Sequence, residues 1–181
     1  MRKIIASLAV SADGYIARPD GDVEWLNRLP DTIDHGMGEF FKTIDTTVLG
    51  RKTHDWGLQY SRTHTMSGSM FDSRLANYVF SRHPPGEVMP NVQFSSESVE
   101  TFTKRMRAMP GKNIWMMGGG DLIASFLDAG EIDEFDMHVI PVFIGEGIPL
   151  IAPRHRDLPL RLLECTPYED GVVRLRYSTR Q

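Results

Sequence analysis

Apolar runs in this chain alternate with amphipathic segments. Residues 3–10 are dominated by aliphatic side chains, which predicts a buried first strand. Residues 11–22 carry the turn signals Asp13-Gly14 and Pro19-Asp20-Gly21 and are expected to form a loop. The run at 46–49 predicts a second strand, with a helix beginning near Lys52.

A helix is predicted over residues 32–42, because its apolar positions fall on one helical face. These positions are Ile33, Met37, Phe40, Phe41 and Ile44. The polar stretch 59–69 is expected to be a surface loop.

Further strands are predicted over 78–80, 92–94, 113–117 and 132–141, and helices over 99–109 and 121–128. In 132–141 apolar residues alternate with Asp136 and His138, as in a half-buried strand. Residues 160–165 and 172–177 predict a closing hairpin with Cys165 in the core. The expected fold is therefore α/β, with a mostly parallel mixed sheet, an antiparallel C-terminal hairpin and helices on both faces.

Composition narrows the class of protein. A chain of 181 residues is expected to form a single domain over residues 1–181. The net charge of −4 argues against a general nucleic-acid binder, and no apolar run approaches the roughly 20 residues of a membrane span. With one cysteine, Cys165, and no secretion signal, we expect a cytoplasmic protein.

Two glycine turns carry the clearest chemistry. Gly50-Arg51-Lys52-Thr53 and Gly118-Gly119-Gly120 each follow an apolar strand and precede a helix. Glycine lets a phosphate approach the main chain, and a helix start supplies N–H groups and a positive dipole end. Each turn is also compatible with a tight strand–helix connection that binds nothing.

A third segment, Ser81-Arg82, follows the strand at 78–80. Ligands of open α/β sheets collect beyond the carboxyl ends of the strands. We therefore expect this segment to share one edge with both glycine turns. Arginine suits a phosphate there because its planar fork donates paired hydrogen bonds.

Six segments follow one another along the chain in a specific order: 7–17, 48–53, 79–82, 117–120, 138–142 and 145–150. Taken together in this order, they resemble the dihydrofolate reductase fold. They look most like the branch that includes the reductase domain of bacterial riboflavin biosynthesis.

The resemblance implies an NADPH site. Gly50, Arg51, Lys52 and Thr53, with Ser81 and Arg82, would hold the adenosine half and its 2′-phosphate. Gly118, Gly119, Gly120, Asp121 and Leu122 would carry the pyrophosphate, and Ala6, Ile16 and Ala17 would border the nicotinamide. The cations at Arg51, Lys52 and Arg82 agree with a 2′-phosphate, which NAD lacks.

Two carboxylates are candidates for catalysis. Asp34 lies 16 residues before Gly50, the spacing at which dihydrofolate reductases place their substrate-binding carboxylate. The alternative is that Asp34 caps the predicted helix. Asp13 belongs to a loop that faces substrate in the riboflavin branch, although an Asp-Gly pair is also an ordinary turn.

The expected function is NADPH-dependent hydride transfer to a small heterocycle (pteridine- or pyrimidine-like) or a ribosyl compound. True dihydrofolate reductase activity is one alternative, and a non-catalytic NADP(H)-binding sensor or interaction protein is another. No metal site is expected, because no histidine has metal-ligand spacing. The expected partners are a small-molecule substrate and a second copy in a homodimer, with neither nucleic acid nor membrane.

Overall fold

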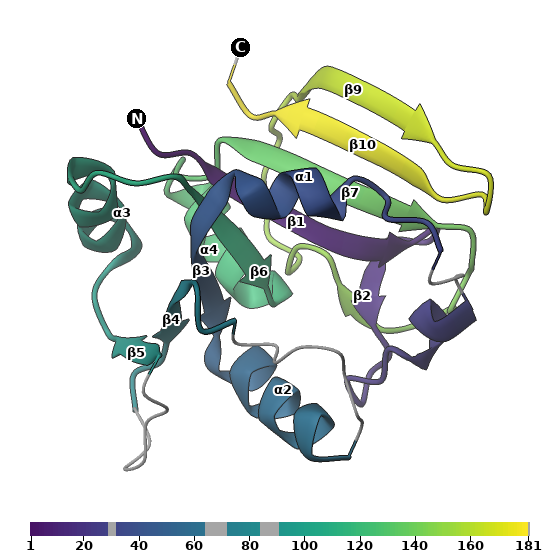
Figure 1. The fold of residues 1–181 in the computed structure, drawn as a ribbon, viewed down its shortest axis with the longest axis horizontal. Coiled ribbons are helices and arrows are strands. Elements are labelled where there is room, and N and C mark those ends of the chain that lie inside the picture. The colour runs from purple at the N-terminus through teal and green to yellow at the C-terminus, as the bar shows by residue number, and fades with distance from the viewer. Residues whose placement is uncertain (29–31, 64–71, 84–90, 181) are drawn as a thin grey trace.

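A computed structural model describes residues 1–28, 32–63, 72–83 and 91–180. Eight strands form one sheet in the order β5-β4-β3-β6-β1-β7-β10-β9 (Figure 1). They are β1 (Ile4–Ser11), β3 (Ile44–Gly50), β4 (Ala76–Phe80), β5 (Val92–Ser95), β6 (Asn113–Gly118), β7 (Glu134–Ile140), β9 (Arg161–Pro167) and β10 (Val173–Ser178).

The sheet is parallel from β5 to β7, and β10 runs antiparallel to both β7 and β9. The expected mixed sheet with an antiparallel C-terminal hairpin is confirmed. A separate two-stranded sheet pairs β2 (Tyr15–Ala17) with β8 (Ile148–Pro149). The sequence pattern had assigned β2 to a loop, and two such short strands leave little periodicity to detect.

Helices cover both faces of the main sheet (Figure 1). They are α1 (Met37–Lys42), α2 (Arg51–Thr63), α3 (Val99–Ala108) and α4 (Gly120–Asp128), with a short 3-10 helix η1 (Glu24–Arg28). Phe102 and Met106 of α3 share a core cluster with Phe126 of α4. On the opposite face Phe40 of α1 packs with Ile5 and Ile44. The predicted three-layer arrangement follows from these two apolar clusters.

The predicted helix 32–42 is wrong in its first half. His35 and Gly36 have φ angles of 51° and 79°, in the left-handed region, so the helix begins only at Met37. Phe41 is 42% exposed, and Ile44 belongs to β3 rather than to this helix. A helical pattern does not reveal a left-handed break within it, although Gly36 is a residue that tolerates one.

Three smaller expectations also change. The loop predicted over 59–69 is helical up to Thr63, and its remainder lies outside the described residues. Asp136 and His138 are both buried, not solvent-facing. Cys165 is exposed, because β9 ends the sheet and nothing in the described chain covers it.

Candidate cofactor-binding edge of the sheet

Three neighbouring parallel strands deliver the glycine turns and Ser81 to one edge. Gly50 pairs with Phe80 across β3 and β4, and Leu49 pairs with Gly118 across β3 and β6. Because these strands are parallel, their carboxyl ends face the same way. The prediction that the three segments share an edge is confirmed.

The two glycine turns touch each other. A β-carbon on Gly50 would lie 3.9 Å from both the Gly118 oxygen and the Gly119 nitrogen. A β-carbon on Gly119 would lie 3.4 Å from the Thr53 hydroxyl oxygen. The starts of α2 and α4 therefore flank one seam, and each contributes first-turn N–H groups that have no partner within their helix.

Different constraints favour glycine at each of the three positions of the turn 118–120. Gly118 has φ of 108°, which disfavours any other residue. Gly120 is required by packing, because its β-carbon would lie 2.4 Å from the Pro149 carbonyl oxygen. Gly119 is extended and has only ordinary contacts, as has Gly50. Side-chain packing thus does not account for the glycines at 50 and 119, and close approach of a ligand would.

The Arg51 side chain already has hydrogen-bond partners within the fold. Its Nε lies 2.7 Å from both Asp55 carboxylate oxygens, and its guanidinium donates to the His83 carbonyl at 3.0 Å. Burial acts to raise the pKa of Asp55, but the hydrogen bonds from His54 and Arg51 outweigh it and lower that pKa. Arg51 therefore ties the start of α2 to the segment after β4.

Lys52 and Arg82 present the other two cations of this edge. Both are exposed, and within residues 1–28, 32–63, 72–83 and 91–180 neither forms an ion pair. Ser81 is partly buried, and its hydroxyl donates to the His83 carbonyl at 3.0 Å. Lys52 and Arg82 are thus the cations with free charge for an anionic ligand.

The residues expected near a nicotinamide are divided between the main sheet and the two-stranded sheet. Ala6 pairs with Met116 and Phe135 in the centre of the sheet and has no exposed surface. Ile16 and Ala17 lie in β2.

The segment 147–152 fastens β2 to the start of α4. A β-carbon on Gly147 would lie 2.2 Å from the Ala17 oxygen, and the Ala152 N–H donates to the Gly120 oxygen at 3.1 Å. Asp121 and Leu122 lie in the first turn of α4, and the Leu122 N–H donates to the Gly119 oxygen at 3.0 Å.

The Asp13 carboxylate accepts its hydrogen bonds from groups within the fold. Its carboxylate accepts from the Ser11 hydroxyl at 2.6 Å and from the Gly145 N–H at 2.8 Å, and the Ile144 N–H also donates to it. The Ser11 hydrogen bond is the main reason that the pKa of Asp13 is lowered. Asp13 is therefore ionised at neutral pH and fastens the loop after β7.

Asp34 lies before α1 rather than within its first turn. It is exposed, and its two oxygens accept from the Gly38 N–H at 3.0 and 3.1 Å. This contact satisfies an N–H in the first turn of α1, although the N-cap position itself is Gly36 and has no side-chain cap. Within the described chain it leaves most of the lone pairs of Asp34 free.

A buried polar cluster next to Asp34 was missed by the sequence pattern. His138 Nε2 lies 2.9 Å from the His35 carbonyl oxygen, and the His35 ring lies 2.7 Å from Asp170. Arg174 forms a paired contact with Asp136 at 2.6 and 2.8 Å. The alternation of Asp136 and His138 against Arg174 and Arg176 in paired strands was the available signal.

Burial lowers the pKa of His138 in this cluster, against the opposing effects of the His35 carbonyl and Asp136. Hydrogen bonding to Asp136 raises the pKa of Arg174, so the guanidinium stays charged. The cluster holds the segment before α1 against β7 and β10.

Among the described residues, no three His, Cys, Asp or Glu side chains are grouped to hold a metal ion. None of the helices in the described ranges has the length and apolar character needed to cross a bilayer.

Residues 2–174 match the RibD C-terminal domain family. The chain belongs to this family. The Bacillus subtilis (strain 168) uncharacterized protein YwjB is 36% identical over 176 residues, covering 97% of each chain. A putative riboflavin biosynthesis protein from Shewanella sp. PV-4 has a similar structure, with a TM-score of 0.81, 24% identity and 98% coverage of each chain.

The fold also extends to dihydrofolate reductases. The Enterococcus faecalis dihydrofolate reductase, solved with NADP(H), gives a TM-score of 0.64 at 14% identity over 99% of this chain and 97% of that one. The resemblance drawn from the sequence is confirmed at the level of family and fold.

Proposed function

We propose that this chain is an NADPH-dependent reductase that transfers hydride to a small heterocyclic (pteridine- or pyrimidine-like) or ribosyl acceptor. The observation that carries the proposal is the contact between Gly50 and the Gly118-Gly119 turn at the carboxyl edge of the parallel sheet. Membership of the RibD C-terminal domain family supports it, as does the fold shared with a reductase solved with NADP(H).

The residues of this edge fit the coenzyme. Gly119, Gly120, Asp121 and Leu122, with Gly118 before them, would receive the pyrophosphate at the start of α4. Thr53 and Gly50 would border the same phosphates from the other side of the seam. When bound, NADPH supplies the hydride, so the protein has to orient it and exclude water.

We assign the 2′-phosphate to Arg82 and Lys52, with Ser81 nearby. Both cations are exposed and without an ion pair in the described chain, whereas Arg51 is neutralised by Asp55. In this arrangement Arg51 contributes by positioning the segment that bears Arg82, through the His83 carbonyl.

Of the two carboxylates, we favour Asp34 as the group that meets the acceptor. Asp13 accepts three hydrogen-bond donors and is fixed in its ionised form, which leaves no proton to give. Asp34 has free lone pairs at an exposed position, which suits anchoring a polar heterocycle.

The test is a fluorescence titration with NADPH and NADH, followed by turnover with dihydrofolate and with pyrimidine and ribosyl compounds. The proposal expects saturable NADPH binding, tighter than NADH, and NADPH consumption with a non-folate acceptor. Consumption with dihydrofolate would identify a true dihydrofolate reductase. Tight binding without turnover of any acceptor would favour the sensor alternative, and no saturable binding would reject all three.

We further propose that the chain pairs with a second copy through the face of β9 that carries Leu160 and Leu162, which is opposite to the face of Arg161 and Leu163. This strand ends the sheet, and Leu160 and Leu162 are 41% and 53% exposed on or beside it. An open edge strand with apolar side chains is a liability unless it is covered. Sedimentation of the wild-type chain is expected to give a dimer, and Leu162→Glu a monomer. A monomeric wild-type chain would contradict the pairing.

A further inference from the structure

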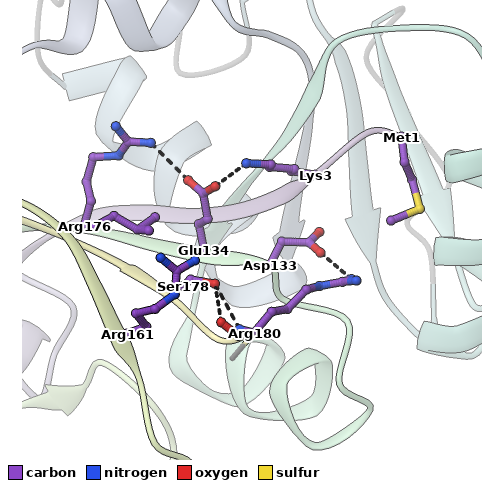
Figure 2. Close-up of a pocket in the computed structure, with 9 residues that line it drawn as sticks. Met1, Lys3, Asp133, Glu134, Arg161, Arg176, Ser178 and Arg180 are labelled. Atoms are coloured by element: carbon purple, nitrogen blue, oxygen red, sulfur yellow. Dashed lines mark hydrogen bonds and ion pairs between the residues drawn. The ribbon is translucent and has the colours of Figure 1, made fainter.

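A second feature lies at the opposite edge of the sheet, where β1 and β7 begin. A surface depression of about 600 Å³ is lined by Met1, Lys3, Asp133, Glu134, Arg161, Leu163, Arg176, Ser178 and Arg180 (Figure 2). The lining joins the first residues of the chain to the β9–β10 hairpin. Because β1 and β3 are parallel, this place is at the other end of the strands from the glycine turns.

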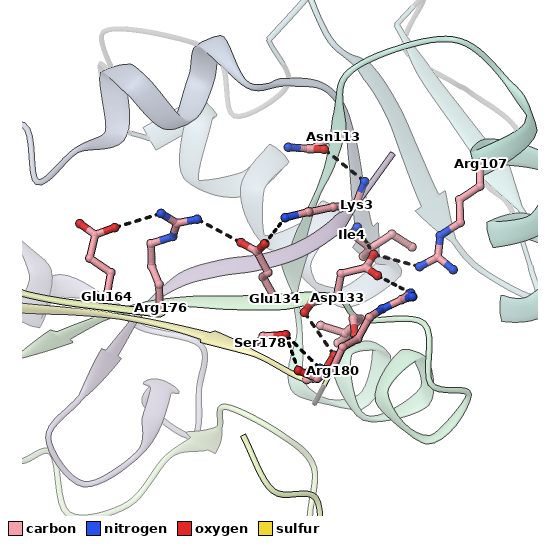
Figure 3. Close-up of polar contacts among 12 residues, drawn as sticks. Lys3, Ile4, Arg107, Asn113, Asp133, Glu134, Glu164, Arg176, Ser178 and Arg180 are labelled. Atoms are coloured by element: carbon pink, nitrogen blue, oxygen red, sulfur yellow. Dashed lines mark hydrogen bonds and ion pairs between the residues drawn. The ribbon is translucent and has the colours of Figure 1, made fainter. Parts of the chain in front are cut away.

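The two carboxylates of the depression are fully occupied. Glu134 lies between Lys3 and Arg176, and its contact with Arg176 is 3.1 Å (Figure 3). Asp133 contacts Arg107 at 2.9 Å and also pairs with Arg180. Both carboxylate side chains are buried, at 6% and 7% exposure. Each negative charge is therefore shared by two cations and lies beneath them.

The cations remain in excess. Four cationic side chains and two carboxylates line the depression, so its side chains carry a net charge of +2. The whole chain, in contrast, carries −4. Lys3 and Arg180 are 54% and 53% exposed, so their charged ends reach solvent. Glu164 at the margin offsets part of the charge of Arg176, with a contact of 3.0 Å.

Arg161 is the least compensated of the four. It pairs through its backbone with Ser178, but its side chain forms no hydrogen bond or ion pair with any residue that the structure describes. An arginine at the wall of a depression that already has a cationic surplus gains no stability from its neighbours. An anion in the depression would relieve the electrostatic repulsion among these cations.

We propose that this depression binds the phosphate group of a small phosphate monoester. A dianionic phosphate would match the net charge of +2, and the guanidinium of Arg161 offers two parallel donors to its oxygens. Leu163 would meet the apolar part of the esterified molecule. The volume lies within the range of small-molecule sites.

Amide chemical shifts of the full-length chain test the site directly. The probes are phenyl phosphate and, separately, inorganic phosphate at constant ionic strength. We expect saturable shifts at Lys3, Leu163 and Ser178, with Gly50 and Gly119 unmoved at the same concentrations. Shifts confined to Gly50 and Gly119, or no saturable shift below about 10 mM, would overturn the proposal.

Variants locate the contact. Arg161→Gln removes an exposed side chain that has no partner among the described residues, so the fold is kept, and we expect binding of phenyl phosphate to weaken by about tenfold or more. Arg105→Gln on α3, whose partner is Glu97, is the matched control and should bind as the wild type does. Equal affinity of the wild type and Arg161→Gln would overturn the assignment.

The two probes distinguish the source of the phosphate. Tighter binding of phenyl phosphate, lost in Leu163→Ala, would support an esterified ligand. Equal binding of both probes would support the same anion site with free phosphate as its ligand, and would overturn the role given to Leu163.

Discussion

Thr53 and Gly119 meet across the seam between α2 and α4, where the Thr53 hydroxyl would lie 3.4 Å from a β-carbon on Gly119. The two residues come from glycine turns far apart in the sequence, and the parallel pairing of β3 with β6 brings them together. Helix starts on both sides of one seam are suited to an extended phosphorylated ligand.

Gly119→Ala is expected to weaken NADPH binding without lowering the stability of the fold. An alanine methyl group at this position makes only ordinary contacts, so thermal stability should stay near that of the wild type. The same methyl group would occupy the surface that faces the pyrophosphate, and NADPH should bind about tenfold more weakly or worse. Thermal unfolding and fluorescence titration measure the two effects.

Gly120→Ala is the contrasting variant. Its β-carbon would lie 2.4 Å from the Pro149 oxygen, so we expect a loss of about 1–3 kcal/mol in unfolding free energy. If Gly119→Ala is as destabilised as Gly120→Ala, or binds NADPH normally, the cofactor explanation of Gly119 is wrong.

Arg82→Gln is expected to weaken NADPH by about tenfold and NADH by no more than about twofold, because only NADPH carries the 2′-phosphate. Titration of both coenzymes gives the ratio. Arg74→Gln is a suitable control, since that exposed arginine pairs with Asp72 away from the glycine turns. Equal losses for NADPH and NADH would remove Arg82 from the 2′-phosphate.

Asp13→Asn is expected to loosen the loop after β7. The neutral amide accepts more weakly from the Ile144 and Gly145 N–H groups, so their hydrogen exchange should become faster. Exchange followed by NMR measures this. A variant with unchanged exchange but no hydride transfer would show instead that Asp13 acts in catalysis.

His138 should make stability depend on pH in a defined window. Burial lowers the pKa of His138 below 6.5, so the unfolded chain takes up its proton first as the pH falls. Native stability is therefore expected to decline as the pH drops below 6.5. Asp170, whose pKa is lowered by the His35 hydrogen bond although burial opposes it, adds a separate loss only below its ordinary value of 3.8.

Denaturant unfolding of the wild type and His138→Gln across this pH range checks the assignment. Glutamine keeps an N–H donor for the His35 carbonyl but does not titrate, so the slope just below pH 6.5 should flatten. An unchanged slope would place the titrating group elsewhere.

Local sequence patterns were sufficient for the strands of the main sheet and for the shared edge, but not for β2 and β8. Apolar runs before Gly50, Ser81 and Gly118 predicted three strands, and parallel pairing then required their ends to coincide. The Arg51–Asp55 pair is local, four residues apart on α2, but the second contact of Arg51 is with the His83 carbonyl at another strand end, which the pattern could not show.

The sequence could not show which side chains are buried by contacts between distant segments. Asp136 and His138 looked solvent-facing because their partners, Arg174 and the His35 carbonyl, come from distant segments. Cys165 looked buried because a closing strand was assumed to be covered on both sides. In both cases the deciding contact, or its absence in the described chain, depends on tertiary packing.

The most direct measurement of the central claim is amide chemical-shift mapping of the wild-type chain with NADPH. The account predicts saturable shifts that include Gly50, Ser81 and Gly119 together, with weaker effects from NADH at Ser81 and Arg82. NADPH that leaves these amides unmoved, or moves only residues at the opposite edge of the sheet, would contradict it.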